Sequence, residues 1–196
     1  MQFISFLRAI NVGGRVIPMS ELRKVFESLG FKNVETFIAS GNVFFEKRGT
    51  EGSRYAEAQR KHIGLIEKEI EEALRAKLGY DVDTFLRTPV EIRQVAEAKP
   101  FAVDVLAAAT AYNVAFTRAS LSGQQLEELA SFENAIDGFR ALGREIYWVC
   151  KTKQSKSKFV SAKMERLLGV RVTWRNLNTV RRLCAKYPPP EVKVKR

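Results

Sequence analysis

Residues 3–46 read FISFLRAINVGGRVIPMSELRKVFESLGFKNVETFIASGNVFFE, and this stretch decides the fold. It opens with a nearly continuous apolar run, Phe3 to Ile10, which is typical of a central β-strand. A helix is expected from Pro18, because apolar residues recur at helical spacing from Leu22 to Leu29. Gly30 suits the C-terminal end of that helix. The chain therefore begins strand, loop, helix.

Two short strands follow the helix. The turn Ser40-Gly41-Asn42 separates residues 34–38 from residues 43–46 and predicts a hairpin. A long helix is expected up to Leu78, because Ile63, Ile66, Ile70, Leu74 and Leu78 form one apolar stripe. Residues 82–87 then form a strand. The resulting order, β-α-β-β-α-β, is that of a ferredoxin-like unit.

The second half of the chain repeats this order of elements. Its strands are expected at 112–117, 138–142, 145–150 and 170–174, and its two main helices at 122–132 and 158–168. A connector helix at 89–98 precedes these elements, and a last helix carries Val180, Leu183 and Cys184.

The sequence thus predicts an α+β fold: two ferredoxin-like (βαββαβ) halves form one duplicated protein, plus a C-terminal helix. Residues 1–99 are expected to form the first half with its connector helix. Residues 100–187 form the second half with the C-terminal helix. Residues 188–196 follow a proline run and are expected to be a mobile basic tail.

Charge is distributed unevenly along the chain. Residues 139–196 hold 16 Lys and Arg against 3 Asp and Glu, a net charge of +13, whereas residues 1–138 hold 17 against 19. A strongly basic third on a mildly acidic body predicts an anionic partner for that third.

Composition restricts the compartment and the chemistry. Cys150 and Cys184 are far apart in sequence, which favours a reducing compartment over a disulfide framework or a cysteine-ligated metal. The N-terminus reads as a strand rather than a signal peptide, because Arg8 interrupts its apolar run. We expect a cytoplasmic protein with no membrane partner, and a monomer in preference to an oligomer.

Four segments are similar to a known family: LRAINVGGRVIPMSELR (7–23), ETFIASGNVFFE (35–46), GYDVDTFLRTPVEIRQVAEAKPF (79–101) and SKSKFVSAKMERLLGVRVTWRNLNTVRRL (155–183). In this order they resemble the bacterial family catalogued as domain of unknown function 1697. The resemblance implies an α+β protein of two ferredoxin-like halves, and it implies no activity, substrate or cofactor. The alanine-rich stretch 103–111 departs from the family's usual composition.

The main candidate site lies in the basic third. Ser155-Lys156-Ser157-Lys158 is expected at a helix start, and Arg175 at the start of the last helix. Lysines at a helix N-terminus are unfavourable without an anion, so two basic helix starts predict a phosphate site. The candidate anion-binding residues are Lys156, Lys158, Lys163, Arg175, Asn176, Asn178 and Thr179. The alternative is that Ser157 and either Asn176 or Asn178 are ordinary N-caps and that Lys163 and Arg166 belong to a solvated helix face.

A second candidate cluster comprises Arg8, Asn11, Ser40 and Asn42. Strand alternation places Arg8 on an apolar face, where its charge must be paired or must face a cleft. The loop at Asn11 could offer backbone N–H groups to an anion. The alternative is that Arg8 pairs with a carboxylate such as Glu46 and that both asparagines serve turns.

Few residues suggest catalysis. His62 is the only histidine and is interpreted as a surface residue, and neither a Ser-His-Asp nor a Cys-His pairing follows from the spacing. We expect no metal and no cofactor. The acidic residues Glu67, Glu69, Glu71 and Glu72 are interpreted as a solvated helix face.

Two function classes remain. The first is a binding module for a phosphate-bearing polyanion, with nucleic acid as the leading candidate. The second is an enzyme that acts on a small phosphorylated ligand in the cleft between the two halves. Binding that weakens steeply with salt would favour the first class.

Overall fold

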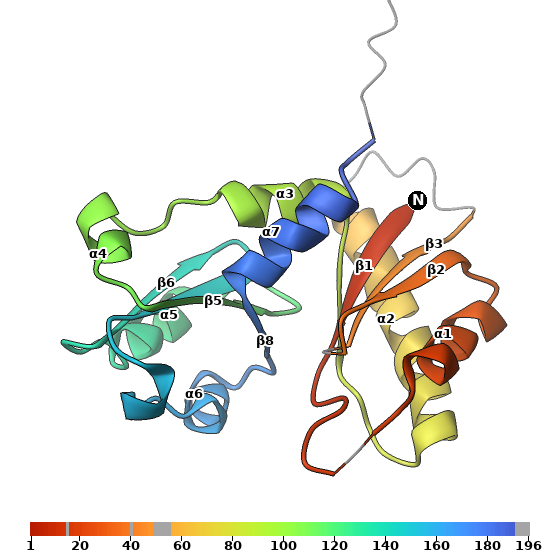
Figure 1. Ribbon diagram of the computed structural model, residues 1–196, viewed down its shortest axis with the longest axis horizontal. Coiled ribbons are helices and arrows are strands. Elements are labelled where there is room, and N and C mark those ends of the chain that lie inside the picture. The colour runs from red at the N-terminus through yellow and green to blue at the C-terminus, as the bar shows by residue number, and fades with distance from the viewer. Residues whose placement is uncertain (15, 40, 49–55, 191–196) are drawn as a thin grey trace, which may run out of the picture. The chain divides into compact units, whose positions relative to one another are not determined.

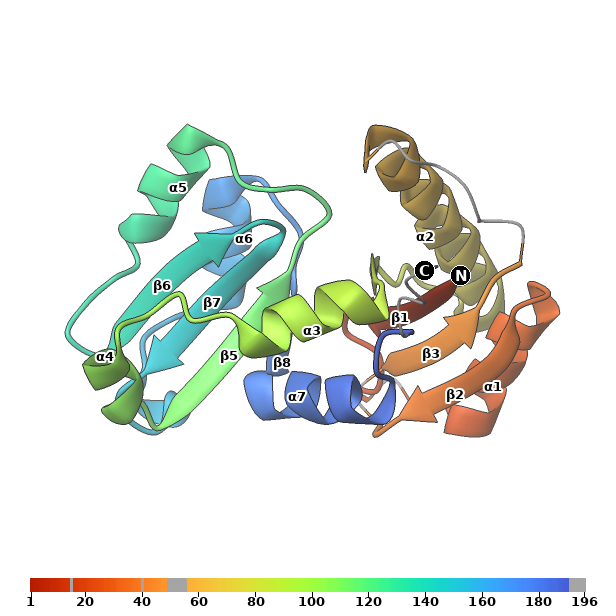
Figure 2. The ribbon, with the colours of Figure 1, turned by 90° about the horizontal axis from the view of Figure 1, so that it is seen from above.

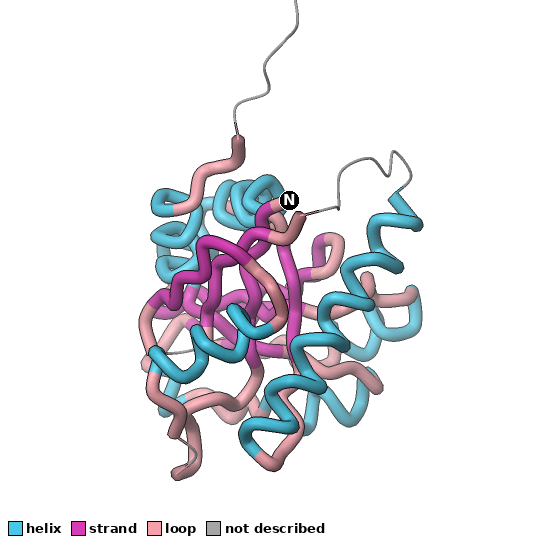
Figure 3. The backbone as a smooth tube through the Cα atoms, turned by 90° about the vertical axis from the view of Figure 1, so that its right-hand side faces the viewer, coloured by secondary structure: helices cyan, strands magenta, loops and turns pink. Residues whose placement is uncertain are grey.

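The structure is a computed structural model that describes residues 1–14, 16–39, 41–48 and 56–190; the remaining residues are grey in Figure 3. The chain divides into two compact units. Unit 1 comprises Met1–Arg93 together with the residues from Leu183 onward, and unit 2 comprises Gln94–Arg182. Each unit holds one four-stranded antiparallel sheet.

Unit 1 contains the first four strands. Its elements are β1 (Gln2–Leu7), α1 (Met19–Ser28), β2 (Lys32–Phe37), β3 (Asn42–Glu46), α2 (Ala56–Leu78), β4 (Thr84–Arg87) and the start of α3 (Pro89–Glu97). The sheet order is β2-β3-β1-β4 (Figure 1). The expected succession of strands and helices is therefore present, although β1 ends at Leu7 because Ala9 takes a positive φ of 55°.

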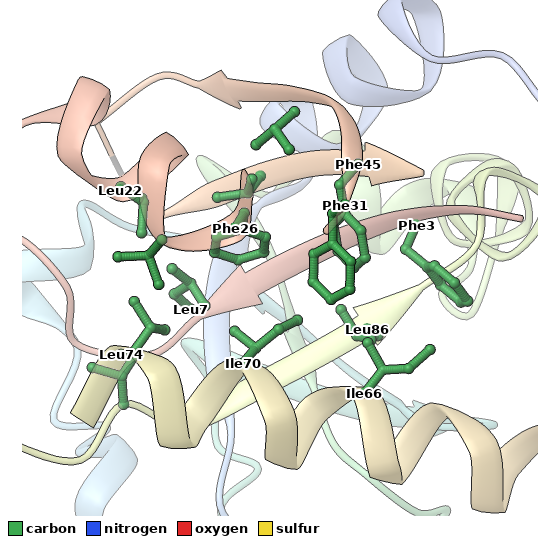
Figure 4. Close-up of a cluster of buried hydrophobic side chains, with 14 of the residues drawn as sticks. Phe3, Leu7, Leu22, Phe26, Phe31, Phe45, Ile66, Ile70, Leu74 and Leu86 are labelled. Atoms are coloured by element: carbon green, nitrogen blue, oxygen red, sulfur yellow. The ribbon is translucent and has the colours of Figure 1, made fainter. Parts of the chain in front are cut away.

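Alternation along β1 divides its side chains between two buried faces. Phe3 and Leu7 face the helices, where Leu22 and Phe26 of α1 and Ile66, Ile70 and Leu74 of α2 complete the core (Figure 4). Ile4 and Phe6 point to the opposite face and are also buried. This two-sided burial explains the nearly continuous apolar sequence of the strand.

Unit 2 contains the second sheet. Its elements are α4 (Val103–Ala107), β5 (Ala111–Phe116), α5 (Gly123–Ala130), β6 (Asp137–Leu142), β7 (Glu145–Cys150), the short 3-10 helix η1 (Gln154–Lys156), α6 (Ser161–Leu168) and β8 (Thr173–Asn176), followed by α7 (Leu177–Lys186). The sheet order is β6-β7-β5-β8. Helices α5 and α6 lie on the same face of this sheet (Figure 2), and Leu129, Met164 and Leu168 pack there against Ile146 and Trp148.

Three details of unit 2 differ from the sequence-based expectation. Helix α6 begins at Ser161 rather than at Lys158, because Ser157 and Val160 have extended backbones. Strand β8 begins at Thr173, three residues later than expected. The alanine-rich stretch forms the short helix α4, which had not been predicted. Of the expected tail 188–196, residues 191–196 lie outside the described residues.

Carboxylates on α2 cover the free edge of β4. Glu67 Oε1 accepts a hydrogen bond from the backbone N–H of Leu86 at 2.8 Å, and Glu71 Oε1 accepts one from Thr84 at 2.7 Å. Glu67 is only 4% exposed. The interpretation of the acidic run as a solvated face was therefore wrong for these two residues, because outward N–H groups of an edge strand require acceptors.

Candidate anion-binding site

The three described members of the second candidate cluster, Arg8, Asn11 and Asn42, belong to unit 1 and have polar partners within the protein. Arg8 forms an ion pair with Asp83 at 3.7 Å, rather than with Glu46. Asn11 Oδ1 accepts from the Ile17 N–H at 2.7 Å, and Asn42 Nδ2 donates to the Phe37 carbonyl at 3.1 Å. Ser40 lies outside the described residues. The contacts support a role in holding turns.

Arg175 does not lie at a helix start. It is the third residue of β8 and is only 8% exposed. One guanidinium nitrogen donates to Thr173 Oγ1 and to the Trp174 carbonyl, each at 2.8 Å. Burial lowers the pKa of Arg175 to about 10, because removal from water disfavours the charged form.

The sheet of unit 2 separates Arg175 from the predicted lysines around α6. Consecutive strand residues point to opposite faces, and Trp174 faces α6, since its Nε1 donates to Ser161 Oγ at 2.8 Å. Arg175 therefore points to the face away from α6, while Lys163 lies on α6 and Lys158 lies three residues before its first residue. The structure thus divides the seven predicted residues into an α6 group, an α7 group and the buried Arg175.

The exposed positive charge of unit 2 concentrates in one stretch, residues 151–171, which we call the basic segment. All seven of its basic residues are exposed: Lys151, Lys153, Lys156, Lys158, Lys163, Arg166 and Arg171. Its one acidic residue, Glu165, is buried and accepts from the Val172 N–H at 2.8 Å. Among the described residues none of the seven forms an ion pair. Lys151, Lys153, Arg166 and Arg171 were missing from the predicted set, although their spacing in the sequence was visible.

The basic segment is held to the sheet by a buried carboxylate. Asp137 is 2% exposed; its oxygens accept from Trp148 Nε1 at 2.9 Å, Ser157 Oγ at 2.8 Å and Asn134 Nδ2 at 3.2 Å. Ser157 Oγ in turn accepts from the Phe159 N–H at 3.0 Å. Ser157 is therefore not a helix cap, as one alternative had it, but the anchor that positions the two flanking lysines. This pairing could not be predicted from the sequence, because Asp137 and Ser157 are twenty residues apart.

The α7 group lies where β8 passes into α7. Asn176 Oδ1 accepts from the Asn178 N–H at 2.9 Å, so Asn176 is the N-cap of α7, as the alternative interpretation allowed. Asn178 Oδ1 accepts from Arg181 at 3.3 Å. Asn176 pairs in register with Asn113 of β5. Asn113 is 7% exposed and its Nδ2 has no partner among the described residues.

Tyr112, on the opposite face of the same strand, gives a prediction for alkaline pH. Its hydroxyl is buried without a partner in the described part of the chain, and burial raises its pKa from 10.0 to about 12. Between these values the unfolded chain loses the phenol proton and the folded protein keeps it, so stability falls as pH rises.

The variant Tyr112→Phe should remove this loss and should stabilise the protein by about 1 kcal/mol at pH 7, because it deletes an unpaired buried hydroxyl. Urea unfolding at pH 7 and pH 11 measures both effects. Arg175 titrates in the same range, but its lowered pKa makes stability rise with pH. Both proteins contain Arg175, so its contribution cancels when the stability of the variant is subtracted from that of wild type. An equal loss of stability in both proteins would contradict the assignment.

The described residues contain no cluster of three or more His, Cys, Asp or Glu side chains that could hold a metal ion. His62 is half-buried, and its buried Nε2 has no hydrogen-bond partner among the described residues. Cys150 is buried and Cys184 half-buried, and neither forms a disulfide within the described residues. Of the described helices, none combines the length and the apolar composition that crossing a bilayer requires.

The fold and the site define the protein as an α+β protein with two four-stranded antiparallel sheets and an exposed basic segment on the second. The chain belongs to the family described as protein of unknown function DUF1697, whose model matches residues 1–147. This confirms the resemblance seen in the sequence, although the segment 155–183 lies beyond the matched range.

A solved structure shows the same fold. The chain is similar to the conserved bacterial protein SP0830 from Streptococcus pneumoniae, with 22% sequence identity and a TM-score of 0.67. The similarity covers 94% of this chain and 97% of that protein. A comparison with curated proteins finds no match.

Proposed function

We propose that the protein binds a phosphate-bearing polyanion, with nucleic acid as the leading candidate, through the basic segment of unit 2. The observation that carries the proposal is the segment's composition and exposure: seven exposed basic residues, and a single acidic residue that is buried. Clustered Lys and Arg attract phosphates independently of sequence, because binding releases condensed counterions.

The start of α6 supports the same proposal. Among the described residues no side chain caps this helix end, and the first turn holds Lys163 and no acidic residue. A cation near the positive end of a helix dipole is unfavourable unless an anion lies nearby. A phosphate at this place could accept hydrogen bonds from lysines and from first-turn N–H groups together.

We further propose that the two units are ferredoxin-like halves that arose by duplication. The observation that supports this is the shared element order, with strand orders β2-β3-β1-β4 and β6-β7-β5-β8. The basic segment lies in unit 2. If the two units arose by duplication, the binding function proposed for this segment would therefore belong to unit 2 and not to the common ancestor of both halves.

Fluorescence anisotropy with labelled single- and double-stranded RNA and DNA, at low and physiological salt, tests the binding proposal. The variant Lys156→Ala/Lys158→Ala/Lys163→Ala should weaken binding at least tenfold at low salt and reduce the slope of log K against log salt by about 2 to 3. The matched control Lys32→Ala/Lys61→Ala/Arg93→Ala removes the same charge from exposed positions of unit 1. Equal weakening in both variants, or no binding by wild type, would refute the assignment to the basic segment.

A further inference from the structure

We propose that the N-terminus of α7 and the amide of Asn113 form a site for one terminal phosphate, that is, a phosphate monoester. The inference rests on the proposed function and deepens it, because it specifies which phosphate of a polyanion is recognised. The site uses three residues of the predicted set, Asn176, Asn178 and Thr179, and adds Asn113.

The first observation is an unsatisfied buried donor. Asn113 Nδ2 is buried on β5 and has no hydrogen-bond partner among the described residues. Buried polar groups of native proteins are nearly always paired, and an unpaired one costs about 1–3 kcal/mol. An orphaned donor of this kind indicates a missing acceptor.

The second observation is the position of the Asn113 side chain on the sheet. Asn113 of β5 and Asn176 of β8 are partners in the antiparallel register. Side chains of such partners lie on the same face with their Cβ atoms about 4.5–5.5 Å apart. The amide of Asn113 therefore lies directly beside the N-cap of α7.

The third observation is the helix start itself. α7 has ten residues, and within the described part of the chain its N-cap Asn176 accepts from the N–H of Asn178 alone. The other N–H groups of a first turn lack helical acceptors, and the helix dipole places partial positive charge there. Arg181, which donates to Asn178 Oδ1, adds a full positive charge one turn later.

Access to the site needs one side chain to move. Asn176 is exposed, so its side chain can rotate away from the helix. An anion would then take the place of Asn176 Oδ1 at the Asn178 N–H and accept from Asn113 Nδ2 beneath. Thr179 in the first turn supplies a hydroxyl donor.

The site adjoins the basic segment. Trp174, two residues before Asn176 and on the same face, donates to Ser161 and packs against Phe159 at a centroid distance of 5.7 Å. A nucleic acid strand whose terminal phosphate lay at the start of α7 could therefore continue along the lysines of the basic segment. A buried donor suits an end group with three free phosphate oxygens better than an internal phosphodiester, whose two bridging oxygens carry sugars.

The test compares one labelled oligonucleotide with a 5′-phosphate or a 5′-hydroxyl, together with inorganic phosphate and a nucleoside monophosphate as small probes. Wild type should bind the phosphorylated strand about tenfold more tightly, as expected for one or two charge-assisted hydrogen bonds. Asn113→Leu, which removes the donor at similar size, should abolish that preference and leave affinity for the 5′-hydroxyl strand unchanged. The lysine triple variant should weaken binding of both strands and keep their ratio.

A second readout does not depend on the variant's folding. In wild type, inorganic phosphate should raise the melting temperature and shift the side-chain amide resonance of Asn113, whereas chloride at equal ionic strength should do neither. If the small probes shift Asn113 but no oligonucleotide binds, the phosphate site stands, its ligand is a small phosphate ester, and the proposed function fails. If both strands bind equally and inorganic phosphate leaves the Asn113 amide resonance unshifted, the proposed function stands and this site is refuted. In that case an internal water accepts the hydrogen bond from Asn113 Nδ2.

Discussion

Replacement of Tyr187 by alanine is expected to lower the free energy of unfolding of unit 1 by about 3 to 5 kcal/mol, the usual cost of deleting a buried aromatic side chain. Tyr187 is 7% exposed and stacks on Phe44 of β3, with ring centroids 4.3 Å apart and planes inclined by 3°. Its hydroxyl donates to Glu35 Oε2 at 3.0 Å. The residue comes from the end of the chain, yet it covers a sheet built from the first strands.

Tyr187→Phe is the matched control, because it keeps the stacked ring and removes only the hydrogen bond, at a cost of about 1 kcal/mol. Lys186 and the Tyr187 hydroxyl lower the pKa of Glu35. That contribution to stability is present at neutral pH and is lost as the pH falls through the lowered pKa, so the difference between wild type and Tyr187→Phe should shrink in acid.

Both tryptophans lie in unit 2, at positions 148 and 174. Their fluorescence therefore reports the unfolding of unit 2. The unfolding of unit 1 is measured instead by amide hydrogen exchange in β1 and β3. If Tyr187→Ala lowers the opening free energy measured at the β3 amides by less than about 1 kcal/mol, the stack of Tyr187 on Phe44 is not required for the stability of the sheet.

The order of elements could be predicted because each element carries its own local signal. The stripe from Ile63 to Leu78 has helical spacing, and residues 145–150 of β7 match the predicted strand at both ends. Helix α6 was placed three residues too early, because Ser157 resembles an N-cap in sequence. In the structure its hydroxyl donates to Asp137 instead, and only the tertiary fold brings the two together.

The candidate site was predictable in its charge and not in its geometry. The excess of Lys and Arg after residue 138 is visible in the sequence. The lysines of the basic segment are exposed, as expected for clustered charges that remain in water. The position of Arg175 was wrong, because Trp-Arg-Asn continues a strand that was expected to end at Trp174. The strand continues for two residues beyond Trp174, so the Arg175 guanidinium lies on the face of the sheet opposite Trp174. Asn113 carries no comparable sequence signal, because the acceptor that its side chain lacks becomes evident only in the folded sheet.

The same dependence on tertiary contacts makes Asp137 the residue of unit 2 whose loss should matter most. Asp137→Ala is expected to cost about 3 kcal/mol, because it removes charge-assisted hydrogen bonds and leaves a buried indole N–H without an acceptor. Ser157→Ala removes one of these bonds and should cost about 1–2 kcal/mol. Urea unfolding followed by tryptophan fluorescence measures both, since Trp148 Nε1 is itself a donor to Asp137.

Limited trypsin digestion separates anchoring of the basic segment from general stability. Lys156 and Lys158 flank the anchor Ser157, so cleavage there should accelerate in both Asp137→Ala and Ser157→Ala under conditions where unit 2 stays folded. Ser131→Ala is a suitable control, because it removes an exposed hydroxyl bond to the Glu128 carbonyl in the same unit. If cleavage in Ser157→Ala were as slow as in this control, the lysines would be held by the packing of Phe159 rather than by the carboxylate. The anchor would then contribute to the core of unit 2 and not to the presentation of charge.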